Sequence, residues 1–306
     1  ISAYHEPQWA RSAQLESGTN AMPARVPRVY RTEAIVLRQR KLGEADRIVT
    51  LYSPQFGKIE AVAKGVRSQT SRKAGHLEPL TWSTLLLAHG QNLDIVTQSE
   101  TVESFMPLRE DLQRLARGIY AAELVDRFSE PRSENYPVFR LLAETLRRLA
   151  SPADPSDLAV RHFELQLLGL VGYRPQLERC VVCSGALTPV TNAFGPALGG
   201  VVCPSCRAGQ PGLWTLSVNA LKVLRLLQRG DWATAAGLHL AAELQSEIEL
   251  LLRGYIRYVL ETTPRSTVFV DALRREANGD AARGLPAGPN TLAATADGPL
   301  VARAGA

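Results

Sequence analysis

The four cysteines of the chain form two pairs with metal-ligand spacing. Cys180 and Cys183 stand in CVVC, Cys203 and Cys206 stand in CPSC, and nineteen residues separate the two pairs. A C-x2-C turn directs two thiolates at one ion, and a second such turn completes a tetrahedral set of ligands. The spacing therefore predicts a structural Zn²⁺ site, since four thiolates leave no open position for a catalytic water.

Two disulfides, or a redox-active pair, are the alternatives for these cysteines. Disulfides are uncommon in cytoplasmic proteins, and no thioredoxin-like βαβ pattern surrounds either pair. Residues 176–214, which contain both pairs, are polar and rich in turn-forming residues. We expect the metal to hold this insert folded.

No other residue pattern points strongly to catalysis. The chain has no GxxxxGK[ST] loop, no GxGxxG after a strand, no HExxH and no GxSxG, and its five histidines are scattered. Glu44 and Asp46 flank a turn, and a nuclease site would need further carboxylates beside them. We expect no enzymatic activity, and a zinc-containing nuclease remains an alternative.

A loop without acidic residues carries much of the positive charge. Ala61–Gly75 contains Lys64, Arg67, Arg72 and Lys73 and no carboxylate. Arg28–Lys73 as a whole has eleven Lys and Arg against four acids, whereas the whole chain has a formal charge of only +5. Cations that lack counter-charges repel one another, and a polyanion such as a nucleic-acid backbone removes that repulsion.

We expect the cations of this segment to contact DNA phosphates. Tyr52, Phe56 and Trp82 are available to stack on bases, although core positions are the favoured interpretation for Tyr52 and Trp82. The predicted DNA-binding residues are Arg38, Arg40, Lys41, Arg47, Lys58, Lys64, Arg67, Arg72 and Lys73.

The elements that carry these residues change type along the chain. Five short strand patterns lie within residues 28–105, and the basic loop falls between the third and the fourth. Helical periodicity follows in residues 106–175 and 215–270, on either side of the insert. We expect residues 1–27 and 271–306 to be a disordered leader and tail. With no apolar run of roughly 18 residues and no signal peptide, the sequence indicates a cytoplasmic protein that does not span a membrane.

Three stretches carry a resemblance to a known family. The segments GEADRIVTLYSPQFGKIEAVAKGVRS and AGHLEPLTWSTLLL resemble the N-terminal barrel of RecO, a family of bacterial recombination mediators. LLGLVGYRPQLERC resembles that family's approach to a four-cysteine insert. The resemblance implies an α+β, multi-domain fold: a five-stranded OB-fold β-barrel, then an all-helical domain with a four-cysteine zinc-knuckle insert. Many members lack the cysteines, so the zinc prediction depends on the spacing in this sequence.

The resemblance also implies a function in DNA repair and recombination. Such proteins bind single- and double-stranded DNA, anneal complementary strands, and with RecR assist RecA loading onto DNA coated with single-strand-binding protein. They are cytoplasmic and nucleoid-associated, and they bind the acidic tail of the single-strand-binding protein on the helical domain. A zinc-stabilised protein-interaction scaffold without direct DNA binding is the alternative. Candidate residues around the tail pocket are Arg114, Arg117, Arg127, Arg132 and Arg140.

Overall fold

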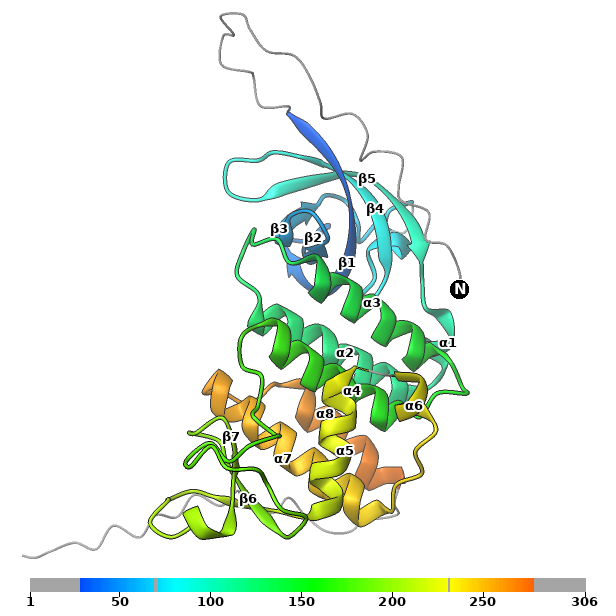
Figure 1. The fold of residues 1–306 in the computed structure, drawn as a ribbon. Helices are drawn as coiled ribbons and strands as arrows, with labels where there is room; N and C mark the ends of the chain where they lie inside the picture. Colours follow the sequence, from blue (N-terminus) through cyan, green and yellow to red (C-terminus); the bar gives the residue numbers. More distant parts are fainter. Residues whose placement is uncertain (1–27, 69–70, 231, 278–306) are drawn as a thin grey trace, which may run out of the picture.

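The computed structural model describes residues 28–68, 71–230 and 232–277. A strand-rich N-terminal part is followed by helices and a small second sheet (Figure 1). This arrangement confirms the mixed α+β fold. The predicted leader, residues 1–27, and the predicted tail from residue 278 onward lie outside the described residues.

The N-terminal part is a closed five-stranded barrel, as predicted. Its strands are β1 (Val29–Leu42), β2 (Asp46–Ser53), β3 (Gly57–Ala63), β4 (Trp82–Ala88) and β5 (Asp94–Glu103), in the order β1-β2-β3-β5-β4. Only the β3–β5 pair is parallel among these strands. The first half of β1 pairs with β4 and the second half with β2, and the register shifts between Val36 and Arg38. This irregularity lets one long strand serve both sides of the barrel.

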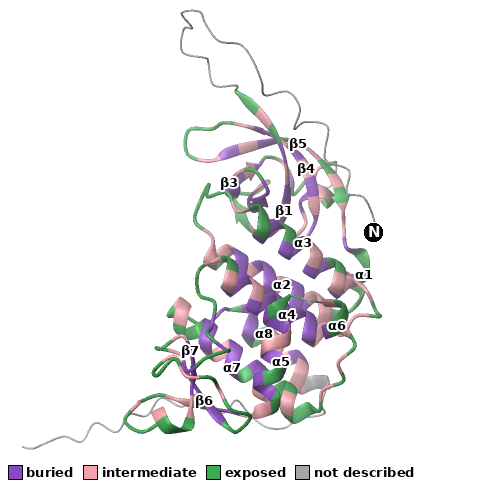
Figure 2. Cartoon of the chain, in the orientation of Figure 1, coloured by how far each residue is buried: buried purple, intermediate pink, exposed green. Residues whose placement is uncertain are grey.

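Alternation along the strands gives the barrel two apolar faces. Val49 and Leu51 of β2 and Ile59 of β3 point into the barrel core. Ile35 of β1 and Tyr52 of β2 point outward, and they share a core with the helices. Buried positions accordingly occur both in the barrel strands and in the helices next to them (Figure 2).

This outer face determines the role of two aromatic residues, Tyr52 and Trp82, that were considered above for base stacking. Tyr52 is 1% exposed and belongs to the core between barrel and helices. Trp82 lies edge-on to Phe139, with 5.3 Å between ring centroids, and the Arg147 guanidinium lies 5.1 Å from the centroid of its ring. Tyr52 and Trp82 therefore stabilise the contact between the two parts of the chain, and they are not available to stack on bases.

The helical part follows the predicted periodicity, and side chains cap several of its helices. Asp111 caps the second helix by accepting hydrogen bonds from the N–H groups of Gln113 and Arg114. Ser217 caps the fifth in the same way, and Gly230 ends it with φ of 83°. Within the described residues the helices are α1 (Met106–Glu110), α2 (Leu112–Phe128), α3 (Tyr136–Ala150), α4 (Ser156–Leu170), α5 (Val218–Arg229), α6 (Trp232–Ala236), α7 (Ala242–Leu260) and α8 (Ser266–Ala277).

Helix α8 corrects one predicted boundary, because it continues to Ala277, past the expected end of the helical domain at residue 270. Glu123 of α2 accepts hydrogen bonds from the backbone N–H groups of Arg265 and Ser266, at 2.8 Å each, and so caps α8. Leu273 is 9% exposed. Packing against a helix that is distant in the sequence stabilises α8. The local amino-acid composition does not reveal such contacts, so it predicted too early an end for the helical domain.

The insert forms its own three-stranded sheet at the end of the molecule away from the barrel (Figure 1). Its strands are β6 (Asn192–Gly195), β7 (Gly200–Val202) and β8 (Trp214–Leu216), in the order β7-β6-β8. Among the described helices, none is both long enough and apolar enough to cross a membrane.

Candidate metal centre and nucleic-acid interface

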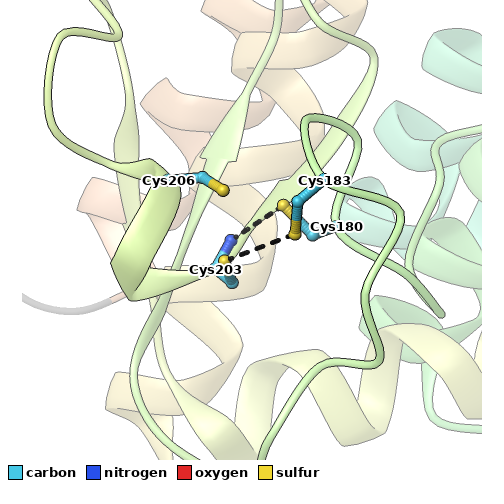
Figure 3. Close-up of side chains that lie close together, drawn as sticks. All are labelled: Cys180, Cys183, Cys203 and Cys206. Atoms are coloured by element: carbon cyan, nitrogen blue, oxygen red, sulfur yellow. Dashed lines mark hydrogen bonds between the residues drawn. The ribbon is translucent and has the colours of Figure 1, made fainter.

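The structure brings the four cysteines together. Their Sγ atoms all lie within 4.8 Å of one another, and Cys183 Sγ is 3.9 Å from Cys203 Sγ (Figure 3). A disulfide would place two sulfurs about 2.05 Å apart. Ligands about 2.3 Å from a tetrahedral zinc ion lie about 3.8 Å from each other. The four thiols are therefore free, and their spacing is suited to a shared metal ion.

Strand β7 (Gly200–Val202) positions the first cysteine pair against the second. Val181 donates its N–H to the carbonyl of Val201 at 2.9 Å, directly beside Cys180. Gly200 is needed here because a Cβ would lie 2.6 Å from the Gln176 carbonyl oxygen. Cys203 follows β7, and its N–H donates to Cys180 Sγ at 3.4 Å. Backbone contacts thus bring the two C-x2-C turns, which are distant in sequence, to one point.

The surroundings of the thiols favour charge on one sulfur. Burial would raise the pKa of the Cys180 thiol, but N–H donors of Cys203, Cys183 and Val182 lower it to about 6. Hydrogen bonds to the Cys203 and Cys183 sulfurs raise the pKa of Cys206 to about 12. Four adjacent thiolates repel one another, and a bound cation removes that repulsion. The four cysteines can therefore bind a metal ion.

The predicted DNA-binding cations fall into two groups, and those of the first are paired with acids. Arg38 lies 3.2 Å from Glu60 and 2.7 Å from Asp126, and Arg40 lies 3.6 Å from Glu60. Arg47 lies 3.2 Å from Glu78. The sequence did not predict these acidic partners, because they lie on other strands, helices or loops than the arginines that they pair with. Pairing reduces the charge that these arginines offer to a phosphate.

Lys58 occupies a largely enclosed position between the barrel and helix α2. Its Nζ donates to the backbone carbonyl of Asp126 at 2.6 Å and lies 3.3 Å from the Asp126 carboxylate. Only 17% of its side chain is exposed. Lys58 therefore joins the barrel to helix α2, and we leave it out of the proposed interface.

The second group lies at the end of the barrel that carries the basic loop, and none of its members pairs with an acid among the described residues. Arg67 donates to the Gly43 carbonyl at 3.1 Å, and Lys73 to the Val96 carbonyl at 3.4 Å. Lys73 is half-buried, whereas the other members are exposed. The group, named here the basic surface, comprises Lys41, Lys64, Arg67, Arg72 and Lys73.

The described part of the basic loop makes hydrogen bonds to another segment of the barrel. The N–H of Arg67 donates to the Ala45 carbonyl at 3.0 Å, and the N–H of Gly65 donates to Asp46 Oδ1 at 2.7 Å. These bonds fasten the loop to the β1–β2 turn. They also occupy Asp46, one of the two acids of the nuclease alternative. Within the described ranges, the cysteine set is the one group of three or more potential metal ligands found.

The five arginines proposed around a tail pocket are dispersed over the helical part and its contact with the barrel. Each lies within 4.0 Å of an acid: Arg114 of Asp111, Arg117 of Asp157, Arg127 of Glu123, Arg132 of Asp94, and Arg140 of Glu144. The structure does not bring them together around one groove.

Comparison with known proteins gives a consistent result for both parts of the chain. Residues 28–105 match the family described as Recombination protein O N terminal, and residues 109–267 match Recombination protein O C terminal. A DNA repair protein RecO from Roseiflexus sp. (strain RS-1) is 46% identical over 248 residues, 81% of this chain and 87% of the relative. One from Dehalococcoides mccartyi (strain BAV1) is 41% identical over 81% of this chain and 97% of its own length. One from Pelotomaculum thermopropionicum is 40% identical over 83% of this chain and 98% of its own length. The chain therefore belongs to the RecO family of DNA repair proteins.

Proposed function

We propose that this chain is a non-enzymatic DNA-binding mediator of recombination in DNA repair, which binds single- and double-stranded DNA and anneals complementary strands. The observation that carries the proposal is the basic surface. Five cations gather at one end of a barrel, with no acidic partner among the described residues. Release of counterions from the DNA backbone favours binding to such a surface.

Annealing follows from the same charge. Two complementary strands repel each other through their phosphates, and cations bound to one strand lower that repulsion. The exposed members of the basic surface, such as Lys64 and Arg72, have long side chains that can follow a sliding backbone. The protein would thus bring strands into register without making or breaking a covalent bond.

Further partners are proposed from the family. With RecR, the protein would assist RecA loading onto DNA coated with single-strand-binding protein, whose acidic tail would bind the helical part. We also propose that the metal is Zn²⁺ with a structural role, because four thiolates suit a closed tetrahedral site. The proposed location is the cytoplasm, at the nucleoid.

A salt-titrated binding and annealing assay tests the proposal. We compare the parent with a variant in which Lys64, Arg67, Arg72 and Lys73 are all changed to Ala. With five phosphates bound, the parent should show a log–log salt slope of about −3.5 for single strands, and the variant a slope flatter by about 2.8. The variant should also lose annealing.

A control variant that removes three cations elsewhere tests for a general effect of net charge. Arg174, Arg207 and Lys222 are exposed and lie outside the barrel. Changing these three to Ala should leave the slope and the annealing rate at the parental values. Annealing by the quadruple variant at the parental rate would contradict the assignment. A parent that retains no DNA at low salt would favour the interaction-scaffold alternative.

A further inference from the structure

Three ring side chains contact one another in a row on the barrel, named here the ring stack: Phe56, Tyr30 and His89. The Tyr30 ring centroid lies 4.9 Å from that of Phe56, at an interplanar angle of 62°. It lies 4.8 Å from that of His89, at 28°, so these two rings are stacked. Tyr30 is near the start of β1, Phe56 lies in the β2–β3 turn and His89 directly follows β4. Three separate segments thus build one short stack.

A buried carboxylate fixes the orientation of this stack. Asp94, with 4% of its side chain exposed, accepts hydrogen bonds from the Tyr30 hydroxyl and from Arg132 Nη2, each at 2.5 Å. Its other oxygen lies 3.4 Å from His89 Nδ1. The backbone N–H of His89 also donates to the Arg28 carbonyl at 3.0 Å. The rings are therefore held in place before any ligand arrives.

The outer end of the stack faces solvent beside a cation. The His89 side chain is 41% exposed, and Tyr30 stacks on one face of its ring, so the opposite face is the one on which a ligand could stack. Arg132 is 51% exposed, and its backbone has a φ of 56°, a left-handed conformation that is strained for this residue. An exposed ring face beside an exposed cation is the combination that single-strand-binding proteins use for a base and its phosphate.

The ring stack is also close to the basic surface. Lys73 bonds to the carbonyl of Val96, which lies two residues after Asp94 on β5, or roughly 7 Å along the strand. His89 opens the β4–β5 connection, and in OB barrels this loop is one of those that bind oligonucleotides. A strand whose phosphates contact the basic surface can therefore reach the ring stack.

We propose that His89 and Arg132 form a binding site for one unpaired nucleotide, in which the base stacks on the open face of His89. The exposed side of the Arg132 guanidinium, whose Nη2 is paired with Asp94, makes a weaker contact with the adjacent phosphate. This inference rests on the proposed DNA binding. In a duplex the base faces are covered by neighbouring base pairs. The site would therefore add affinity for single strands alone, whereas the basic surface binds both forms.

Substitutions at His89 in the whole chain test the site. We measure the binding of labelled single strands and of duplexes of equal length. His89→Ala should weaken single-strand binding about fivefold or more and leave duplex binding unchanged. His89→Phe keeps a ring without a titratable group and should retain the parental affinity. His239→Ala removes an exposed histidine of the helical part and should change neither affinity.

The outcomes separate this site from the function on which it rests. Parental single-strand affinity in His89→Ala would overturn the site, and so would an equal loss for duplexes. A loss in His89→Phe as large as in His89→Ala would show that the ring face is not the contact. A parent that binds neither form would instead overturn the proposed DNA binding and, with it, the site.

Discussion

Gly57 of the barrel lies directly against Ser133 of the loop between α2 and α3, so that a Cβ on Gly57 would come within 1.9 Å of the Ser133 carbonyl oxygen. The neighbouring residues add to this contact, since the N–H of Arg132 donates to the Lys58 carbonyl at 2.8 Å. The turn that begins β3 is therefore shaped by the helical part as much as by the barrel.

Gly57→Ala should destabilise the protein more than Gly43→Ala. Both glycines have positive φ, 59° and 56°, but nothing lies within 4 Å of a Cβ built at Gly43. Gly43→Ala should therefore show the conformational penalty alone, about 1 kcal/mol. Gly57→Ala should lose about 1–3 kcal/mol more, because the contact with Ser133 must open. Urea denaturation measures both, and equal losses would contradict the role of this contact.

Lys58→Met should affect stability and leave the salt dependence of DNA binding unchanged. The variant keeps an apolar side chain but removes the donor to Asp126, and we expect a loss of about 1–3 kcal/mol. Its log–log salt slope for single strands should equal that of the parent. Lys64→Ala, which removes an exposed cation with no acidic partner in the described ranges, should flatten the slope by about 0.7. A flatter salt slope in Lys58→Met would indicate instead that Lys58 contacts DNA phosphates.

The difference between these two lysines marks the limit of the sequence analysis. Strand alternation and turn residues predicted the five barrel strands, and C-x2-C spacing predicted that the four cysteines come together, because both patterns are local. The pairing of Lys58 with Asp126 joins residues 68 positions apart. It depends on how the barrel packs against α2, which no local pattern records.

Contacts between distant segments also explain which parts of the candidate interface the sequence could not predict. The basic surface was predicted among other cations, but nothing local separated its members from those paired with Glu60, Glu78 or Asp126. Tyr30, His89 and Asp94 lie on different segments, and only the closed barrel brings them together.

Changing Cys180 and Cys183 to Ser should abolish metal binding. The parent should contain one zinc ion per chain by elemental analysis, and the variant none. Because the metal is proposed to hold the insert folded, residues 176–214 should become the first site of proteolysis in the variant, whereas the barrel should remain resistant. A chelator should reproduce this pattern in the parent and have no further effect on the variant. A metal-free parent with equal resistance would contradict the site.

His162 should make the helical part sensitive to acid. Burial beside Trp232, together with the neighbouring Arg148 guanidinium, lowers the pKa of His162 from 6.5 to about 4. Its neutral form is the one compatible with the fold, so its contribution is complete above pH 6.5 and is lost as the pH falls toward 4. Over that range the loss should reach about 3 kcal/mol.

Urea denaturation at several pH values checks this expectation. His162→Gln, which stays neutral, should lose less stability than the parent between pH 6.5 and pH 4. His239→Gln, at an exposed position, should keep the parental acid sensitivity. Identical pH profiles for His162→Gln and the parent would contradict the assignment.

The shared core of barrel and helices has a practical consequence for dissecting the protein. A fragment that ends at residue 105 would uncover Ile35, Leu37 and Tyr52, which are at most 5% exposed in the whole chain. Such a fragment would present an apolar patch and be prone to aggregate. Recombinant versions of the barrel should therefore retain α2 and α3, or carry polar replacements on that outer face.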